Sequence, residues 1–420
     1  MSARGAGAAV NDYDAIVIGA GPAGSAAAIL LARAGWSVAL VEKQAFPRRK
    51  VCGECIAASN LPLLEGLGLG AALAETAGPE LRRMALLHGA HAVLAELPAA
   101  ADGRYGWGRA LGRETLDTLL VAQARRAGAT VLQPCAVVAI DGAAGHWRCS
   151  VRDAAAGART LTSRVAIAAH GSWETLPSGR DQRRRRRGDA ELFAFKANFR
   201  NAALEPGCLP VLALDGGYGG MVVADAGIAT LACCVRRDRL RALRAGAAGH
   251  AAGEVVEAWL RSQIAGVGAA LQGAERDGPW LASGPIDPGI RLRAGDQLLR
   301  IGNAAGEAHP ILGEGISMAV QSAGLLCAQL LGPSDRGRPG DGAWHADSAR
   351  RYAAQWRRQF APRLALAAAF AHVAMRPVAS AALVSIARRW PGLLTRGARW
   401  GGKVRSAAEP DRYRLLGEVP

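Results

Sequence analysis

Residues 14 to 24 read Asp-Ala-Ile-Val-Ile-Gly-Ala-Gly-Pro-Ala-Gly, an apolar run that ends in a glycine-rich turn. The stretch from Pro22 to Ala34 is rich in alanine and leucine and predicts a helix, and Ser37 to Val41 form a second apolar run. A strand, a helix and a second strand in this order predict the first unit of a nucleotide-binding α/β fold.

The three glycines of the turn have separate tasks in such a unit. Gly19 allows the tight turn, Gly21 lets the backbone approach a pyrophosphate, and Gly24 lets the helix pack closely on the strand. The free N–H groups at the start of the helix then hold the phosphates. We assign to this dinucleotide site Gly19, Gly21, Pro22, Ala23, Gly24, Glu42 and Lys43.

Glu42 closes the second apolar run, 18 residues after Gly24. A carboxylate at this place accepts hydrogen bonds from ribose hydroxyls and repels a 2′-phosphate. The predicted ligand is therefore FAD or NAD and not NADP.

A second glycine-rich segment favours FAD over NAD. Residues 302 to 316 read Gly-Asn-Ala-Ala-Gly-Glu-Ala-His-Pro-Ile-Leu-Gly-Glu-Gly-Ile, between a predicted strand at 297–301 and a predicted helix at 315–331. Pro310 to Gly315 predict a helix start with free N–H groups, which can hold the pyrimidine edge of a flavin and stabilise the anion formed on reduction.

Together with Arg113-x-x-Leu116-Asp117, these segments resemble the FAD-dependent oxidoreductases of the p-hydroxybenzoate hydroxylase fold. Lys50-Val-Cys52-Gly53-Glu54 resembles the geranylgeranyl reductase branch and its halogenase-like relatives. The resemblance implies that Arg113 reaches the flavin phosphates or ribityl chain and that residue 303 bonds a ribityl hydroxyl. It also implies flavin contacts from Asn303, Gly313, Gly315 and Ile316.

The chain departs from this family at three places. Asn303 replaces the usual Asp, which predicts a less negative site, and Ala169-His170-Gly171-Ser172 replaces an Asp-Gly pair associated with flavin and NAD(P)H. The Trp-x-Trp-x-Ile-Pro signature of flavin halogenases is absent from the sequence. Of the reductases' Tyr-x-Trp-x-Phe-Pro element, only Tyr218 matches, so the resemblance does not name a prenyl substrate.

The predicted fold class is α/β: a Rossmann-type, p-hydroxybenzoate hydroxylase-like FAD-binding domain, a β-sheet substrate domain and a helical C-terminal extension. The FAD-binding domain is discontinuous, over residues 12–178 plus 295–332, with the substrate domain at 179–294 and the helical region at 333–420. Single helices are predicted near 115–127 and 251–271. The longest apolar stretch, 364–387, contains His372 and Arg376-Pro377 and reads as two buried helices.

The cysteines allow two interpretations. Cys52 and Cys55 have the spacing of a redox dithiol, but the prediction is that Cys52 lies near the flavin ring as a small polar wall with a catalytic role, and that Cys55 is packing. No metal is predicted, because Cys233 and Cys234 are adjacent on a predicted strand and point to opposite faces. His170, His309 and His372 receive no proton-transfer role.

The formal net charge is +16, and only four of the 51 basic residues are lysines. GC-rich codon usage explains this composition, so no nucleic-acid partner is predicted. The pentad 183–187 is either a solvated loop or a dock for an anionic carrier protein or phosphate. The basic and aromatic segment 387–405 either lies at a membrane interface or covers a substrate tunnel. We expect a cytoplasmic protein, peripheral at the membrane in the first of these cases.

The predicted function is FAD-dependent redox chemistry at flavin N5 on an apolar isoprenoid, polyketide or aromatic small molecule, held between the flavin and the second domain's sheet. NAD(P)H or a reductase is the expected electron donor. Three alternatives stay open: a hydroxylase or halogenase-like monooxygenase using NAD(P)H and oxygen, a flavoenzyme without net redox as in lycopene cyclases, and a non-catalytic anion-binding protein on a nucleotide-binding scaffold.

Overall fold

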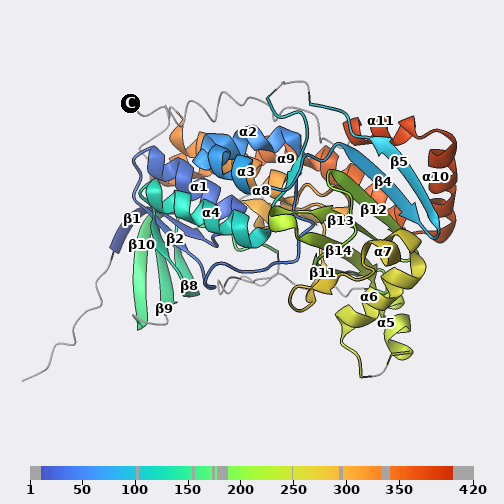
Figure 1. Cartoon of the computed structure of the whole chain (residues 1–420). Helices are drawn as coiled ribbons and strands as arrows, with labels where there is room; N and C mark the ends of the chain where they lie inside the picture. Colours follow the sequence, from blue (N-terminus) through green and yellow to red (C-terminus); the bar gives the residue numbers. More distant parts are fainter. Residues whose placement is uncertain are drawn as a thin grey trace, which may run out of the picture.

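The computed structural model describes residues 11–100, 104–153, 157–172, 176, 188–247, 249–292, 297–332 and 341–400. These residues form two large sheets, with helices around them and a helical C-terminal region (Figure 1). The first sheet has seven strands in the order β7-β2-β1-β10-β9-β8, with β18 paired to β10. Their bounds are β1 Asn11–Ile18, β2 Val38–Val41, β7 Thr130–Leu132, β8 Cys135–Ala143, β9 His146–Asp153, β10 Gly157–Ala168 and β18 Leu299–Arg300.

Strand β1 lies at the centre of this sheet, parallel to both β2 and β10. Its side chains alternate between two buried clusters: Ala15 and Val17 face the helices, and Ile16 and Ile18 face the β8–β9 side. A strand that is covered on both faces needs a continuous apolar run, which explains the Ala-Ile-Val-Ile sequence.

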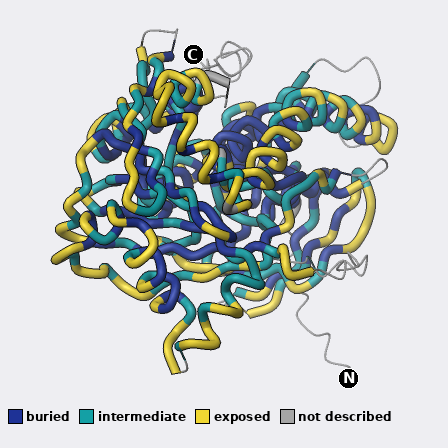
Figure 2. The backbone as a smooth tube through the Cα atoms, turned by 90° about the vertical axis from the view of Figure 1, so that its right-hand side faces the viewer, coloured by how far each residue is buried: buried dark blue, intermediate teal, exposed yellow. Residues whose placement is uncertain are grey.

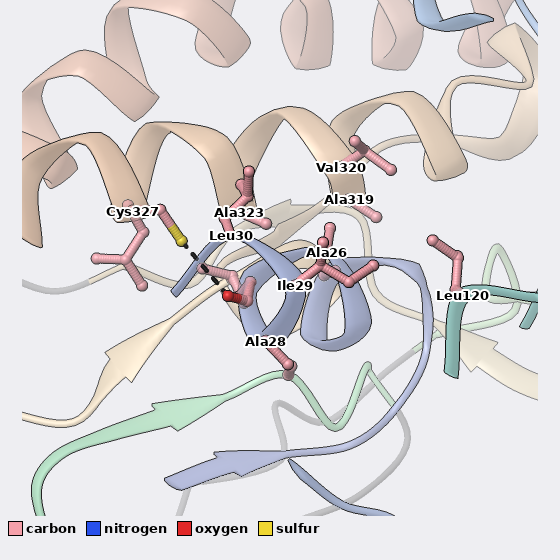
Figure 3. Close-up of a cluster of buried hydrophobic side chains, with 14 of the residues drawn as sticks. Ala26, Ala28, Ile29, Leu30, Leu120, Ala319, Val320, Ala323 and Cys327 are labelled. Atoms are coloured by element: carbon pink, nitrogen blue, oxygen red, sulfur yellow. Dashed lines mark hydrogen bonds between the residues drawn. The ribbon is translucent and has the colours of Figure 1, made fainter. Parts of the chain in front are cut away.

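Helix α1 (Pro22–Arg33) lies between this sheet and helix α8 (Gly315–Leu331), with helix α4 (Arg113–Arg126) beside it. Small side chains on facing turns, Ala26 of α1 and Ala319 and Ala323 of α8, allow the two helices to approach closely (Figure 3). The Cys327 thiol donates to the carbonyl oxygen of Ala27 at 3.8 Å. Residues about 300 positions apart in the chain therefore share one core.

The second sheet has eight strands in the order β15-β11-β14-β13-β12-β4-β5, with β16 paired to β11. Its strands are β4 Arg83–His88, β5 His91–Glu96, β11 Leu192–Arg200, β12 Cys208–Leu214, β13 Gly217–Val223, β14 Ala229–Arg236, β15 Glu275–Arg276 and β16 Leu281–Ile286. Strand β4 pairs with β12 in parallel, so residues 83–96 extend this sheet although they precede most of the first one. The domain boundaries stay a prediction.

Helices α5 (Arg237–Ala245), α6 (Ala252–Gln263) and α7 (Ala265–Ala270) follow β14, and α6 and α7 cover one face of the second sheet. The predicted single helix over 251–271 is wrong, because the chain turns extended at Ile264 (φ −128°, ψ 107°) and splits it in two. Short elements complete the flavin domain: α2 Leu61–Leu64, α3 Gly70–Thr76, β3 Cys55–Ile56 paired with β6 Arg109–Ala110, and β17 Gly289–Ile290 paired with β19 Gly306–Glu307.

The C-terminal region consists of α9 (Gly342–Ala374), α10 (Pro377–Arg389) and α11 (Gly392–Trp400). The first half of α9 packs against α8 through buried Trp356 and Phe360. Residues 364–387 do form the predicted two helices, but the expectation that both are buried is wrong (Figure 2). Phe370 is 49% exposed and Val378 is 84% exposed, since each of these helices buries only one face.

No single helix among the described residues is long and apolar enough to cross a membrane. The pair formed by residues 342–374 and 378–389 meets the length and composition criteria together, with a 98° bend between its two helices.

A buried ion pair joins the two sheets. Glu54, in the loop before β3, is 1% exposed, and its carboxylate receives the Lys196 ammonium from β11. The same carboxylate accepts hydrogen bonds from the Thr230 hydroxyl of β14 and, at 2.8 Å, from the backbone N–H of Arg113. Four separate segments of the chain therefore meet at one carboxylate.

Replacing Lys196 with Met should destabilise the protein by about 3–5 kcal/mol, because it leaves the Glu54 charge buried without its counter-ion. The double variant Lys196→Met, Glu54→Gln should recover much of this loss. Urea unfolding of the FAD-loaded chain measures both. Arg241→Met is the matched control, because its exposed pair with Asp189 should contribute less than about 1 kcal/mol. A loss at Lys196 no larger than this control would contradict the prediction.

Candidate flavin site

The glycine-rich turn has the geometry that its sequence predicts. Gly19 has φ +102°, and a Cβ placed there would lie 2.7 Å from the carbonyl oxygen of Ala169. A Cβ at Gly24 would lie 1.8 Å from the carbonyl oxygen of Gly19, so only glycine lets α1 pack against the turn. A Cβ at Gly21 would meet only the Arg113 guanidinium, at 3.7 Å. The backbone at Gly21 therefore borders open space at the start of α1.

Glu42 stabilises this turn from below. One carboxylate oxygen accepts the N–H of Ala20 at 2.9 Å and the other accepts the N–H of Gln44 at 3.0 Å. The Arg48 guanidinium lies 3.9 Å from the same carboxylate. Glu42 thus holds the loop in its binding shape, and its predicted contact with a ribose stays a prediction.

A groove of about 290 Å³ opens over the carboxyl ends of β1 and β2. It is lined by Gly19, Gly21, Glu42, Lys43, Arg48, Lys50 and His170, among others. Within the part of the chain that the structure describes, both ring nitrogens of His170 and the Nε of Arg48 are buried without a hydrogen-bond partner. Buried polar atoms of this kind need a partner, and the phosphates and hydroxyls of a dinucleotide fit them.

Arg113 lies at the first turn of α4 and points toward the glycine-rich turn. Its guanidinium donates two hydrogen bonds to buried Asp117, at 2.8 and 2.7 Å. Burial alone would lower the pKa of Arg113, but the neighbouring Asp117 carboxylate and Cys52 thiol raise it above its usual value. Arg113 therefore stays charged at the place where the pyrophosphate is expected.

Cys52 lies beside Arg113, and its sulfur accepts the N–H of Glu54 at 3.4 Å. Cys55 lies in β3, and both cysteines are free thiols. The catalytic role of Cys52 stays a prediction. Cys233 and Cys234 point into different clusters on the two faces of β14, as their adjacency predicts. The described residues contain no group of three or more His, Cys, Asp or Glu that could hold a metal ion.

Asn303 lies in a small polar network. Its amide donates to the Glu307 carboxylate at 3.1 Å, and Glu307 also accepts Ser172 and Arg291, each at 2.9 Å. Asn303 was expected to make this pocket less negative than in the family. That expectation is wrong, because Glu307 supplies a buried carboxylate four residues further on, balanced by Arg291.

The start of α8 forms the far end of the candidate flavin site. Gly313 has φ +65°, and a Cβ at Gly313 or Gly315 would meet nothing within 4 Å, while Ile316 is buried in the core. Next to Gly313 lies a cavity of about 40 Å³ with mostly apolar walls. Its walls include Cys55, Leu81, Leu97, Trp107 and Leu209.

The structure also brings together Tyr218 and His309, which the sequence analysis did not pair. The Tyr218 hydroxyl lies 2.9 Å from His309 Nδ1, between β13 and the segment that enters α8. Burial raises the pKa of Tyr218 well above its usual value and lowers the pKa of His309 to about 4. No local pattern signals this contact, since the two residues are 91 positions apart.

Two other predicted features differ in their outcome. His372 is exposed and contacts Arg376 at 2.7 Å, away from the flavin site. The arginine pentad 183–187 and the residues from 401 onward lie outside the described residues.

Comparisons with known proteins agree with this geometry. Residues 12–205 match the family described as FAD binding domain. The menaquinone reductase of Mycobacterium tuberculosis is 36% identical over 130 residues, which are 31% of this chain and 31% of that protein. The match thus spans about a third of this curated relative.

Two solved structures share the fold. The myxobacterial chondrochloren halogenase superposes with a TM-score of 0.72 at 20% identity, covering 86% of this chain and 82% of that one. A geranylgeranyl bacteriochlorophyll reductase-like protein from Thermoplasma acidophilum superposes with a TM-score of 0.65 at 16% identity, covering 97% and 96%.

These findings identify an α/β flavoprotein whose residues 12–205 are an FAD binding domain. The chain is a flavoenzyme of the p-hydroxybenzoate hydroxylase fold, similar to the geranylgeranyl reductase and halogenase-like branch, and FAD is its cofactor.

Gly21→Val should abolish FAD binding, because a β-branched side chain would fill the open space that the pyrophosphate needs. The flavin content of the purified protein, read from its visible absorbance, measures this. Gly66→Val is the matched control, since Gly66 is exposed and a Cβ there meets nothing within 4 Å. A folded Gly21→Val protein with stoichiometric flavin would show that the site is misassigned.

The stability of the FAD-free protein should fall in acid because of His170. Burial, and then the charges of Arg300, Arg291 and Lys50, lower the pKa of His170 to about 4. Between this value and the unfolded pKa of about 6.5, only the unfolded chain binds the proton, so the stability present above pH 6.5 declines as pH falls.

The expected slope from this residue is on the order of 1 kcal/mol per pH unit. Urea unfolding between pH 7 and pH 5 measures it. His170→Asn should flatten the dependence, whereas His250→Asn, at an exposed position, should not. Parallel pH profiles for the native and His170→Asn proteins would refute the assignment.

Proposed function

We propose that this flavoenzyme catalyses the oxidation or reduction of a carbon–carbon bond in an apolar small molecule of the isoprenoid, polyketide or aromatic class. The observation that carries the proposal is the apolar cavity whose walls include Gly313 and Glu314, at the start of α8. The 40 Å³ of this cavity is smaller than any such substrate, so binding requires its walls to move apart.

The residues around the site would divide the work of binding and orientation. Gly21 and Arg113 would hold the pyrophosphate, and Asn303 would bond the ribityl chain. The N–H groups at the start of α8 would face the pyrimidine edge of the flavin, where the helix dipole stabilises negative charge. When bound, FAD supplies or accepts a hydride at N5, and reduction of a carbon–carbon double bond needs one proton besides.

Tyr218 is the proposed source of that proton. Its raised pKa keeps the hydroxyl protonated, and the lowered pKa of His309 keeps the imidazole neutral at pH 7. A neutral imidazole 2.9 Å away can accept or return a proton, which positions the hydroxyl for transfer. His309 directly precedes Pro310 of the flavin-binding segment, so this pair lies beside the expected flavin.

The identity of a relative supports the reductase direction. The mycobacterial protein that matches a third of its length to this chain is named a menaquinone reductase. We infer that a partner reductase supplies the electrons, because His170-Gly171 stands where hydroxylases of this fold carry the Asp-Gly pair linked to NAD(P)H. The similarity to a halogenase structure speaks for the fold and leaves a monooxygenase as the second candidate.

The test is a stopped-flow experiment on the FAD-loaded enzyme. Dithionite should reduce the flavin fully, NADPH should reduce it slowly, and oxygen added with substrate should give no hydroperoxide absorbance and no labelled oxygen in the product. Candidate substrates are a prenylated quinone, a geranylgeranyl lipid and a phenolic acid. Tyr218→Phe should lower turnover about a hundredfold without changing dithionite reduction, and Tyr13→Phe in β1 should leave turnover unchanged.

A flavin hydroperoxide together with one labelled oxygen atom in the product would replace the reductase proposal by the monooxygenase alternative. Full turnover in Tyr218→Phe would remove Tyr218 from the mechanism but leave the reaction class standing.

A further inference from the structure

The C-terminal part of the chain has a one-sided charge distribution. Residues 348–408 contain no Asp or Glu and 12 Arg or Lys. The whole chain has 35 acidic residues, so such a long interval without one differs strongly from the rest. This segment includes most of α9 and all of α10 and α11.

The end of α9 exposes apolar side chains along one stripe. Leu366, Phe370 and Val373 follow the i, i+4, i+7 spacing of one helical face, and each is at least 36% exposed. Ala367 and Ala371, on the opposite face, are fully buried. The core therefore takes the small side chains, and the large ones face outward.

Helix α10 repeats this arrangement. Val384 and Ala387 are buried, whereas Val378, Leu383 and Ile386 are exposed. The exposed series continues through Trp390 and Leu393 at the start of α11. We call the eight exposed residues the C-terminal apolar face: Leu366, Phe370, Val373, Val378, Leu383, Ile386, Trp390 and Leu393.

Cations accompany this face. Arg376, Arg388, Arg389 and Arg396 are all exposed, and they belong to the same turns and helices as the apolar residues. Figure 1 shows α10 and α11 at the edge of the molecule beside β4 and β5, at the end opposite to β8 and β9. An apolar face with basic residues and no acidic ones matches the interface of an anionic bilayer, where acyl chains take the apolar residues and headgroups take the cations.

We propose that the C-terminal apolar face binds the surface of an anionic lipid bilayer, with α10 and α11 in the plane of the interface. The 98° bend between the two parts of the α9–α10 pair fits helices that lie on a membrane better than one straight span. The apolar residues insert at the level of the headgroups, and the arginines contact lipid phosphates.

This face lies next to the apolar cavity of the candidate flavin site. Ala398 of α11 packs against the cluster that contains Leu81, Leu97 and Leu209, which also line the cavity. The membrane-binding helix is therefore part of the cavity's outer cover. Entry of a lipid-dissolved substrate at this point rests on the proposed function, whereas membrane binding itself does not.

The test is flotation of the FAD-loaded, full-length chain with vesicles of phosphatidylcholine containing 30% phosphatidylglycerol, without substrate. Binding should occur on these vesicles and drop at least tenfold on pure phosphatidylcholine. Phe370→Gln, Leu383→Gln, Ile386→Gln combined should lower the partition coefficient at least tenfold, and Arg388→Gln, Arg389→Gln, Arg396→Gln combined should do the same.

Matched controls remove the same chemistry elsewhere: Val138→Gln on β8, and Arg241→Gln, Arg244→Gln on α5, all at exposed positions. They should bind like the native chain. No binding to anionic vesicles overturns the proposal, and so does binding that only the arginine variant weakens, since it shows charge attraction without insertion. A dimer that the apolar variant dissociates, with no vesicle binding, overturns it in favour of contact between copies of this chain.

Because flotation is measured without turnover, its failure leaves the proposed reaction untouched, and failure of the reaction test leaves membrane binding untouched.

Discussion

The Glu54 carboxylate sets the distance between the two sheets. Removing a carboxylate and an ammonium from water costs several kcal/mol each, and only close contact with good hydrogen bonds offsets this cost. Glu54 satisfies the requirement with Lys196, with Thr230 and with the N–H of Arg113. Since these partners come from the second sheet and from α4, any shift of one layer against the other would break several bonds at once.

The same carboxylate determines where the neighbouring residues of the flavin site lie. Cys52 and Cys55 flank Glu54 in the chain, and the N–H of Arg113 is one of its donors. The thiol beside Arg113, the strand that lines the apolar cavity and the first turn of α4 are therefore positioned together. A second close contact, between Ala23 and Gly302, brings the two glycine-rich segments to one place.

The local parts of this site could be predicted from the sequence, because they follow from backbone geometry within a few residues. The turn at Gly19 to Gly24, the helix at 315–331 and the opposite faces of Cys233 and Cys234 are such cases. Each depends on steric limits or on periodicity, which a single sequence carries.

What the sequence did not reveal depends on contacts between distant residues. Glu54 and Lys196 are 142 positions apart, and a lysine in a strand does not show which carboxylate it meets. Glu307 changes the charge around Asn303 only because the chain turns back between them. The exposure of residues 364–387 was missed for a related reason, since apolar composition does not show which helix face the core leaves uncovered.

The position of α1 has a consequence for the order of assembly during synthesis. Its two covers are β10, about 140 residues later, and α8, about 300 residues later. The first strand and helix of the chain thus leave the ribosome long before their partners exist, and their apolar faces wait unprotected. Contacts of such high sequence separation also slow folding, because the loop-closure entropy precedes any gain from packing. Newly made chains should therefore depend on chaperones until α8 has emerged, and only then does the nucleotide groove take shape.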